Sequence, residues 1–202
     1  MYEIVENAGL KLLGPYERVK YVLDKLSSMA SDKKKLVFVA LLVSLALATN
    51  YVLISVPNVK LMDFVTFLAG KTLGFAWGAA TATLIWLVYG TINPYGFSAS
   101  ILPVLIVSEM SYCVAGSLVG NRFSGRSNKE KFFIYGIVGL LSTLIYDIAT
   151  NAAVGILFYG SIITGLITMN FPLPMGLIHE LSNAIMFPSL SLALEPYVKF
   201  LF

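Results

Sequence analysis

Apolar residues run in long, almost uncharged segments along most of this chain. The long segments cover residues 36–56, 75–89, 99–119, 132–158 and 175–194, and a shorter one covers residues 61–69. An apolar helix of about 20 residues rises roughly 30 Å, which is the thickness of a bilayer core. The pattern therefore predicts an all-α membrane protein with six transmembrane helices. The shortest segment is under-length for a crossing, so it needs support from surrounding protein.

A different pattern occupies residues 1–31. Here apolar positions recur at helical spacing, and charged residues lie between them. This spacing favours an amphipathic helix on the membrane surface, and a disordered tail is the alternative. We therefore divide the chain into a cytoplasmic amphipathic segment, residues 1–35, and a six-helix membrane domain, residues 36–202.

The distribution of charge predicts the orientation. Three lysines at residues 33–35 precede the first long segment, and the connection at residues 121–131 is also basic, whereas residues 90–98 and 160–174 carry no charge. Because basic loops stay in the cytoplasm, both termini are expected there and the chain is expected in the plasma membrane. Lys60 and Asp63 then fall on the outside. With 57% hydrophobic and 12% charged residues and a net charge of +3, the composition excludes an ordinary soluble domain and suggests no nucleic-acid partner.

Ionisable residues interrupt three of the apolar segments. Glu109, Asp147 and Glu180 each cost at least a few kcal/mol in a membrane unless they are paired or hydrated. Each has polar companions one helical turn away, and all fall between the mid-plane and the outer end of their segments. They predict a cavity that opens outward, unless they only pair with neighbours such as His179 to hold the bundle together. The predicted substrate-binding residues are Asn50, Tyr51, Asn58, Trp86, Asn93, Tyr95, Glu109, Tyr112, Asp147, Asn151, His179, Glu180 and Asn183.

Motifs for enzyme chemistry are incomplete. The run from His179 to Asn183 begins like HExxH but ends in asparagine, and the chain has no second histidine for a zinc pair. Residues 70–72, Gly-Lys-Thr, resemble the end of a P-loop, but Val65 stands where its first glycine belongs. A single cysteine, Cys113, forms neither an intrachain disulfide nor a multi-cysteine metal site. We therefore expect no enzyme activity, no cofactor and no metal.

Small residues four apart mark one face of the first long segment. Ala40, Ser44 and Ala48 form a shallow stripe that lets another helix approach closely. The stripe fits a partner subunit or a neighbouring helix of the same chain, and both interpretations stay open.

Four features together carry a family resemblance. They are the Ala40, Ser44 and Ala48 stripe, the Pro-Asn-Val-Lys loop at residues 57–60, the Gly-Phe-Ala-Trp-Gly-Ala run at residues 74–79, and Asn-Pro-Tyr-Gly at residues 93–96. From residue 36 to its end, the chain resembles the substrate-binding S component of energy-coupling-factor (ECF) transporters. The resemblance implies a high-affinity binder of a vitamin or related micronutrient. Its partners would be a membrane coupling subunit and two ATPase subunits, and the stripe would be the docking surface, with serine where the family has alanine or glycine.

Two other functions stay open. A self-sufficient ion-coupled carrier would use Asp147 or Glu109 as a proton site, although no half-to-half repeat is visible. A membrane enzyme is the second alternative. Acids and amides outnumber the cations Lys60 and His179 among the candidates, so a neutral or amine-bearing heterocycle is the expected substrate.

Overall fold

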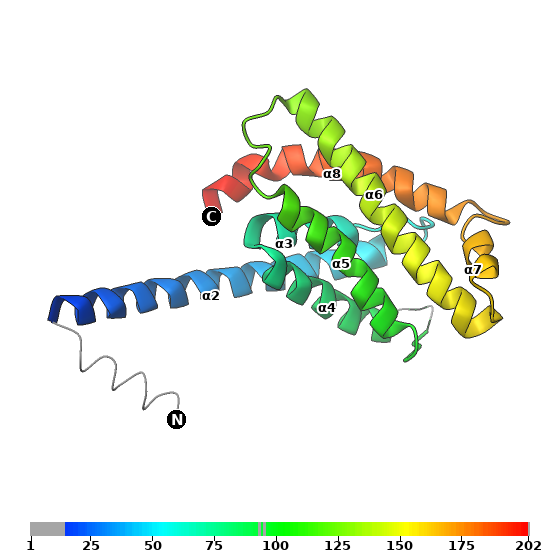
Figure 1. Cartoon of the computed structure of the whole chain (residues 1–202), viewed down its shortest axis with the longest axis horizontal. Coiled ribbons are helices and arrows are strands. Elements are labelled where there is room, and N and C mark those ends of the chain that lie inside the picture. The colour runs from blue at the N-terminus through cyan, green and yellow to red at the C-terminus, as the bar shows by residue number, and fades with distance from the viewer. Residues whose placement is uncertain (1–14, 93, 95, 202) are drawn as a thin grey trace. The chain divides into compact units, whose positions relative to one another are not determined.

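The computed structural model describes residues 15–92, 94 and 96–201, and side chains at residue 17 and at 31–197 apart from positions 93 and 95 (Figure 1). Within that part all regular structure is helical, which confirms the all-α class. In chain order the elements are α2 (Pro15–Val52), α3 (Met62–Leu73), α4 (Phe75–Ile92), α5 (Leu102–Val119), α6 (Asn128–Val154), the π-helical turn η1 (Gly155–Tyr159), α7 (Ile162–Thr168) and α8 (Met175–Leu201).

The long apolar segments form helices of membrane-spanning length. Within the described residues five stretches are long and apolar enough to cross a bilayer, namely Ser31–Val52, Phe75–Ile92, Leu102–Val119, Asn128–Tyr159 and Met175–Tyr197. They coincide with the five long segments predicted from the sequence, with boundaries shifted by a few residues. The chain therefore has the character of a multi-pass membrane protein. The number of crossings and the side on which the termini lie stay predictions.

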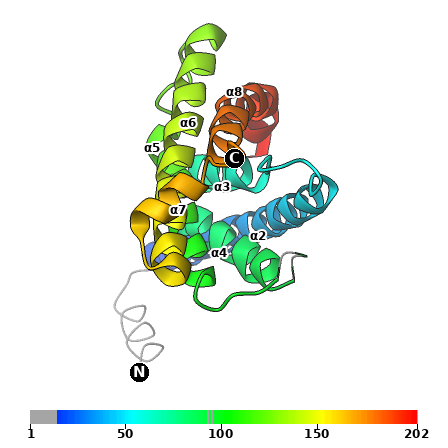
Figure 2. The same cartoon turned by 90° about the vertical axis from the view of Figure 1, so that its right-hand side faces the viewer.

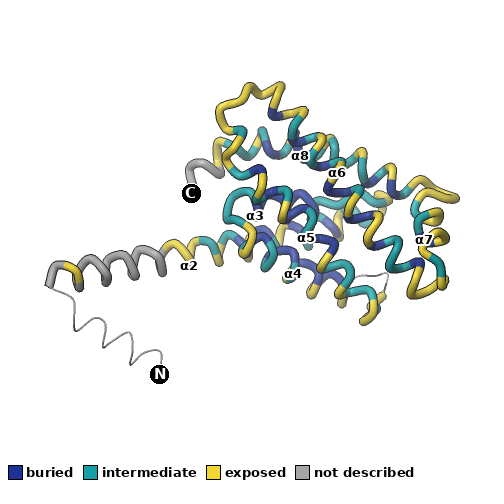
Figure 3. The backbone as a smooth tube through the Cα atoms, viewed as in Figure 1, coloured by how far each residue is buried: buried dark blue, intermediate teal, exposed yellow. Residues whose placement is uncertain are grey.

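The short apolar segment forms α3, which differs from the other helices. It has 12 residues, so it rises only roughly 18 Å, and its residues from Met62 to Gly70 are all buried. It packs against α4 and α5 and also contacts α8, and Figure 3 shows it as largely buried. The segment predicted as a sixth span is thus enclosed by protein, and it is too short to be counted with the five spanning helices.

The chain forms two compact units, residues 1–38 and residues 39–202. The predicted amphipathic segment, residues 1–35, falls wholly within the residue range of the first unit. Residues 1–14 and the side chains of residues 18–30 lie outside the described part, so its amphipathic character stays a prediction. The backbone is helical from Pro15 and continues without a break to Val52.

In the second unit two helix pairs dominate the packing. Helix α6 packs against α8, and α3 packs against α5, and the members of each pair are neighbours in Figures 1 and 2. Helix α7, in the connection that the sequence predicted only as an uncharged loop, packs against η1 and α6. Helix α6 begins with a capping box. The Ser127 hydroxyl accepts from the Glu130 backbone nitrogen, and the Glu130 carboxylate accepts from the Ser127 backbone nitrogen.

The approach of α3 to α5 depends on glycine. A Cβ atom at Gly116 would collide with the backbone carbonyl oxygen of Phe67 and lie 2.8 Å from the backbone nitrogen of Lys71. Only a residue without a side chain lets the two backbones meet at this distance, as in other close helix contacts in membranes.

We expect Gly116→Ala to lower the free energy of unfolding by about 1–3 kcal/mol, because the added methyl group forces α3 and α5 apart. Thermal unfolding of the purified protein in detergent measures the effect. Gly125→Ala is the matched control, since a Cβ atom there has no neighbour within 4 Å. Equal unfolding temperatures for both variants would contradict the close-contact explanation.

Candidate functional site

A buried hydrogen-bonded cluster joins three helices through His179. Its Nε2 atom lies 2.6 Å from Oδ2 of Asp63, and its Nδ1 atom lies 2.9 Å from Oδ1 of Asp147. Asp63 comes from α3, Asp147 from α6 and His179 from α8, and each side chain is at most 5% exposed. An imidazolium can donate to both carboxylates at once, which offsets one of their two charges.

Asn183 extends this cluster by one turn along α8. Its Nδ2 atom donates to Oδ2 of Asp63 at 2.9 Å and to Oγ1 of Thr143 at 2.9 Å. The Thr143 hydroxyl in turn donates to the carbonyl oxygen of Gly139 at 2.7 Å. Asp63, His179, Asp147, Asn183 and Thr143, the histidine cluster, therefore tie α3, α6 and α8 together in the interior.

Glu109, on α5, is a further buried acid, and Trp86 on α4 holds it by a hydrogen bond. Its Oε2 atom accepts a hydrogen bond of 3.0 Å from Nε1 of Trp86, and the residue is completely buried between α4 and α5. Its Oε1 atom has no hydrogen-bond partner in the described part of the chain. The carboxyl groups of Asp63, Asp147 and Glu109 are thus all kept inside the protein.

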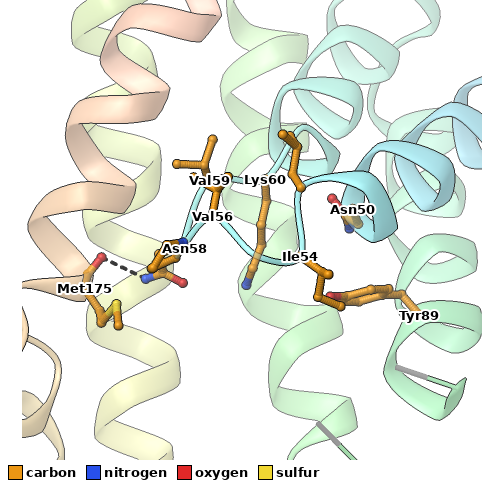
Figure 4. A pocket seen from close by; sticks show the side chains of 10 residues that line it. Asn50, Ile54, Val56, Asn58, Val59, Lys60, Tyr89 and Met175 are labelled. Carbon is orange, nitrogen blue, oxygen red and sulfur yellow. Dashed lines mark hydrogen bonds between the residues drawn. The ribbon is translucent and has the colours of Figure 1, made fainter. Parts of the chain in front are cut away.

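Two neighbouring hollows lie in the second unit and share Lys60 and Tyr89 on their linings. The larger has a volume of about 470 Å³ and is enclosed mainly by the loop between α2 and α3, residues 53–60. Figure 4 shows the Lys60 side chain running between Asn58 on one side and Tyr89 on the other. The smaller, of about 270 Å³, is lined by the connection from α4 into α5 and by the rings of Trp86 and Tyr146. Small-molecule sites commonly have volumes in the range of the larger hollow.

Hydrogen bonds and ring contacts fix the walls of these hollows. Asn58 has a φ of 54°, and its Nδ2 atom donates to the carbonyl oxygen of Met175 at 2.8 Å, which fastens the loop to the start of α8. The rings of Trp86 and Tyr89 meet edge to face with centroids 6.0 Å apart. The Nζ atom of Lys60 lies 5.9 Å from the Trp86 centroid, within the range of a cation–π contact.

Some of the predicted site residues line the two hollows, and others lie in the interior, in or near the histidine cluster. Asn50, Asn58 and Trp86 line a hollow. The residues that lie instead in the buried interior are Glu109, Tyr112, Asp147, His179 and Asn183.

The remaining candidates lie apart from both groups. Tyr51 is 39% exposed and donates its hydroxyl to the carbonyl oxygen of Ile92 at 3.1 Å. The Asn151 amide donates to the Asp147 carbonyl oxygen of its own helix. Glu180 is only partly buried, and no hydrogen bond of the described cluster reaches it. Asn93 and Tyr95 lie outside the described residues. As ligand contacts, all of the predicted residues stay predictions.

Sequence reasoning did not select four residues that shape this region: Lys60 and Tyr89 line both hollows, Tyr146 lines the smaller one, and Asp63 lies in the cluster. Asp63 was counted with Lys60 among the charges on the outer side of the membrane; that side stays a prediction, and the structure adds that the residue is only 1% exposed. Its partner His179 lies 116 positions away, so no local pattern indicates the pair. The available signal was an acid at the start of an apolar segment too short to span a membrane.

The stripe on α2 faces away from the interior. Ala40, Ser44 and Ala48 are all exposed, whereas Val39 and Ala46 on the opposite face are buried. The Ser44 hydroxyl donates to the carbonyl oxygen of Ala40 at 2.8 Å, so its polarity is satisfied within the helix. The stripe is therefore a smooth surface with no unpaired hydroxyl group.

No protein-family model matches the chain, and neither a curated protein nor a solved structure matches it.

Proposed function

We propose that this chain is the substrate-binding S component of an ECF transporter in the plasma membrane. It would bind a vitamin or related micronutrient from outside the cell and hand it to a membrane coupling subunit with two ATPase subunits. The observation that carries the proposal is the pair of hollows, lined by mostly apolar side chains with a few aromatic and polar ones, within a bundle of apolar helices.

The linings of the hollows suit a small organic solute. The larger hollow has the asparagines Asn50 and Asn58, and the smaller has three aromatic rings, among otherwise mostly apolar residues. A few fixed polar groups among apolar and aromatic walls are typical of sites that bind small molecules. Two of the walls are loops, and loops held by a helical scaffold commonly carry binding residues.

The α2 stripe supports the docking part of the proposal. Three small exposed residues on one face let a partner helix approach within backbone contact. The hydroxyl of Ser44 is already bonded within α2, so a partner helix would cover no unsatisfied donor there.

The Gly-Lys-Thr run at residues 70–72 does not have the structure of an ATP-binding P-loop. In a P-loop the lysine and threonine open a helix, so that backbone N–H groups point at the phosphates. Lys71 and Thr72 instead lie in the last turn of α3, so they offer no such amides. An ATP-driven uptake system built on this chain would take its ATPase subunits from elsewhere.

The histidine cluster favours one second candidate, an ion-coupled carrier. Two carboxylates and a histidine buried among spanning helices are a common arrangement for a proton relay. In such a carrier Asp147 would take up and release a proton during each transport cycle, and no partner subunit would be needed.

One reconstitution separates these candidates. The purified chain is placed in liposomes alone, or together with an ECF coupling subunit and its two ATPases, and tested with a panel of radiolabelled water-soluble vitamins. We expect one vitamin to bind the chain alone without any ion gradient, and to accumulate inside only with the partner subunits and ATP. Accumulation by the chain alone, driven by a proton gradient, would instead support the carrier.

A further inference from the structure

The charge on the linings of the two hollows differs from that expected from the sequence. Among the described residues Lys60 is the only charged side chain on either lining, and it belongs to both. Two of the three acids predicted for the cavity are engaged behind its walls, where Trp86 bonds Glu109 and His179 bonds Asp147, and the third, Glu180, is on neither lining. The charged side chain that a solute in either hollow would meet is therefore a cation, Lys60.

The nitrogen donors near Lys60 are already used. Nε1 of Trp86 donates to Glu109, and Nδ2 of Asn58 donates to the carbonyl oxygen of Met175. Nδ2 of Asn50 is directed at the sulfur of Met62, 2.8 Å away. Among the side-chain nitrogens of the two linings, the Lys60 ammonium is thus the one best placed to donate hydrogen bonds to a solute.

The shape of the smaller hollow complements this charge. Its lining includes the rings of Trp86, Tyr89 and Tyr146, and Lys60 lies where it meets the larger hollow. Aromatic walls favour flat rings, which stack on them or meet them edge to face. A flat ring in the smaller hollow would place its substituent beside the ammonium.

We propose, building on the function proposed above, that the hollows bind a planar aromatic molecule with one carboxylate, and that the carboxylate pairs with Lys60. A phosphate group carries up to two charges and is usually bound by several donors or by arginine, and the described linings hold one lysine and no arginine. An amine would be repelled by the same lysine. This inference replaces the neutral or amine-bearing heterocycle expected from sequence.

Three pyridines that differ only in charge test the inference on the purified full chain in detergent. The probes are nicotinate, nicotinamide and 3-(aminomethyl)pyridine, which carry a negative, a neutral and a positive substituent on the same ring. Ligand-observed NMR titration measures each dissociation constant. We expect nicotinate to bind at least ~10-fold more tightly than the other two, which corresponds to about 1.4 kcal/mol.

Variants assign the preference to one residue. We expect Lys60→Gln to weaken nicotinate binding ~10-fold and leave nicotinamide binding unchanged, and Lys60→Arg to keep most of the preference. Lys129→Gln removes the same charge from the exposed first turn of α6 and is expected to change nothing. Tighter binding of the amine, equal binding of all three probes, or no binding of any probe at millimolar concentration would each overturn the inference.

This test is independent of the transport assay. A carboxylate preference that disappears in Lys60→Gln, in a chain that never associates with a coupling subunit, would refute only the ECF assignment. ATP-driven uptake of an amine-bearing vitamin would refute only the carboxylate inference.

Discussion

Ala40→Trp and Ala48→Trp are each expected to abolish ATP-driven uptake and to leave the affinity for the substrate unchanged. Both positions are exposed on α2, so an indole fits on the free chain without disturbing its interior. The same indole would hold a partner helix several ångströms away, since close helix contacts in membranes need small side chains. Uptake into proteoliposomes and equilibrium binding to the same purified variants measure the two quantities.

The control for this experiment is Ala149→Trp. Ala149 is also exposed, but it lies on α6 and outside the stripe. We expect uptake by this variant to match that of the unchanged chain. Full uptake by both stripe variants would show that the stripe does not contact the coupling subunit. If the stripe variants lost substrate binding as well as uptake, the substitutions would have disturbed the fold.

His179→Ala is expected to lower the free energy of unfolding by roughly 3–5 kcal/mol. The substitution leaves Asp63 and Asp147 buried without the group that bridges them, and removing one partner of a buried ion pair has a cost of this size. Denaturation of the purified protein in detergent, followed by circular dichroism, measures the loss.

Two further variants test whether the stability loss in His179→Ala comes from the unpaired carboxylates. Glu180→Gln alters the neighbouring, partly buried acid on α8 and is expected to change stability by less than ~0.5 kcal/mol. Adding Asp63→Asn and Asp147→Asn to His179→Ala removes the unpaired carboxylates and should recover part of the loss. A change below ~1 kcal/mol in His179→Ala would mean that the cluster does not hold the three helices together.

The helices could be predicted from sequence because the signal for each one is local. An uninterrupted apolar run fixes both the position and the length of a spanning helix, and the five long runs lie within a few residues of the spanning helices. The short run was identified, but its surroundings were not. That α3 is enclosed by α4 and α5 depends on contacts such as Gly116 against Phe67, which are distant in sequence.

The site was harder to predict than the helices, because hydropathy does not indicate which polar groups pair. Glu109 and Asp147 were singled out by their cost in a membrane, and both do face the interior. The sequence left open whether they pair or face a solute, and in the structure Trp86 and His179 bond them. Lys60 received little weight because it precedes the apolar segment, yet the loop that holds it lines both hollows.

Native mass spectrometry of the purified full chain, released from detergent in the spectrometer, tests most directly whether this chain captures a small solute. We expect one small aromatic acid to remain bound to each chain, and to be lost in Trp86→Ala. A chain that carries only lipid and detergent, even after incubation with the vitamin panel, would contradict the assignment of a solute-binding site.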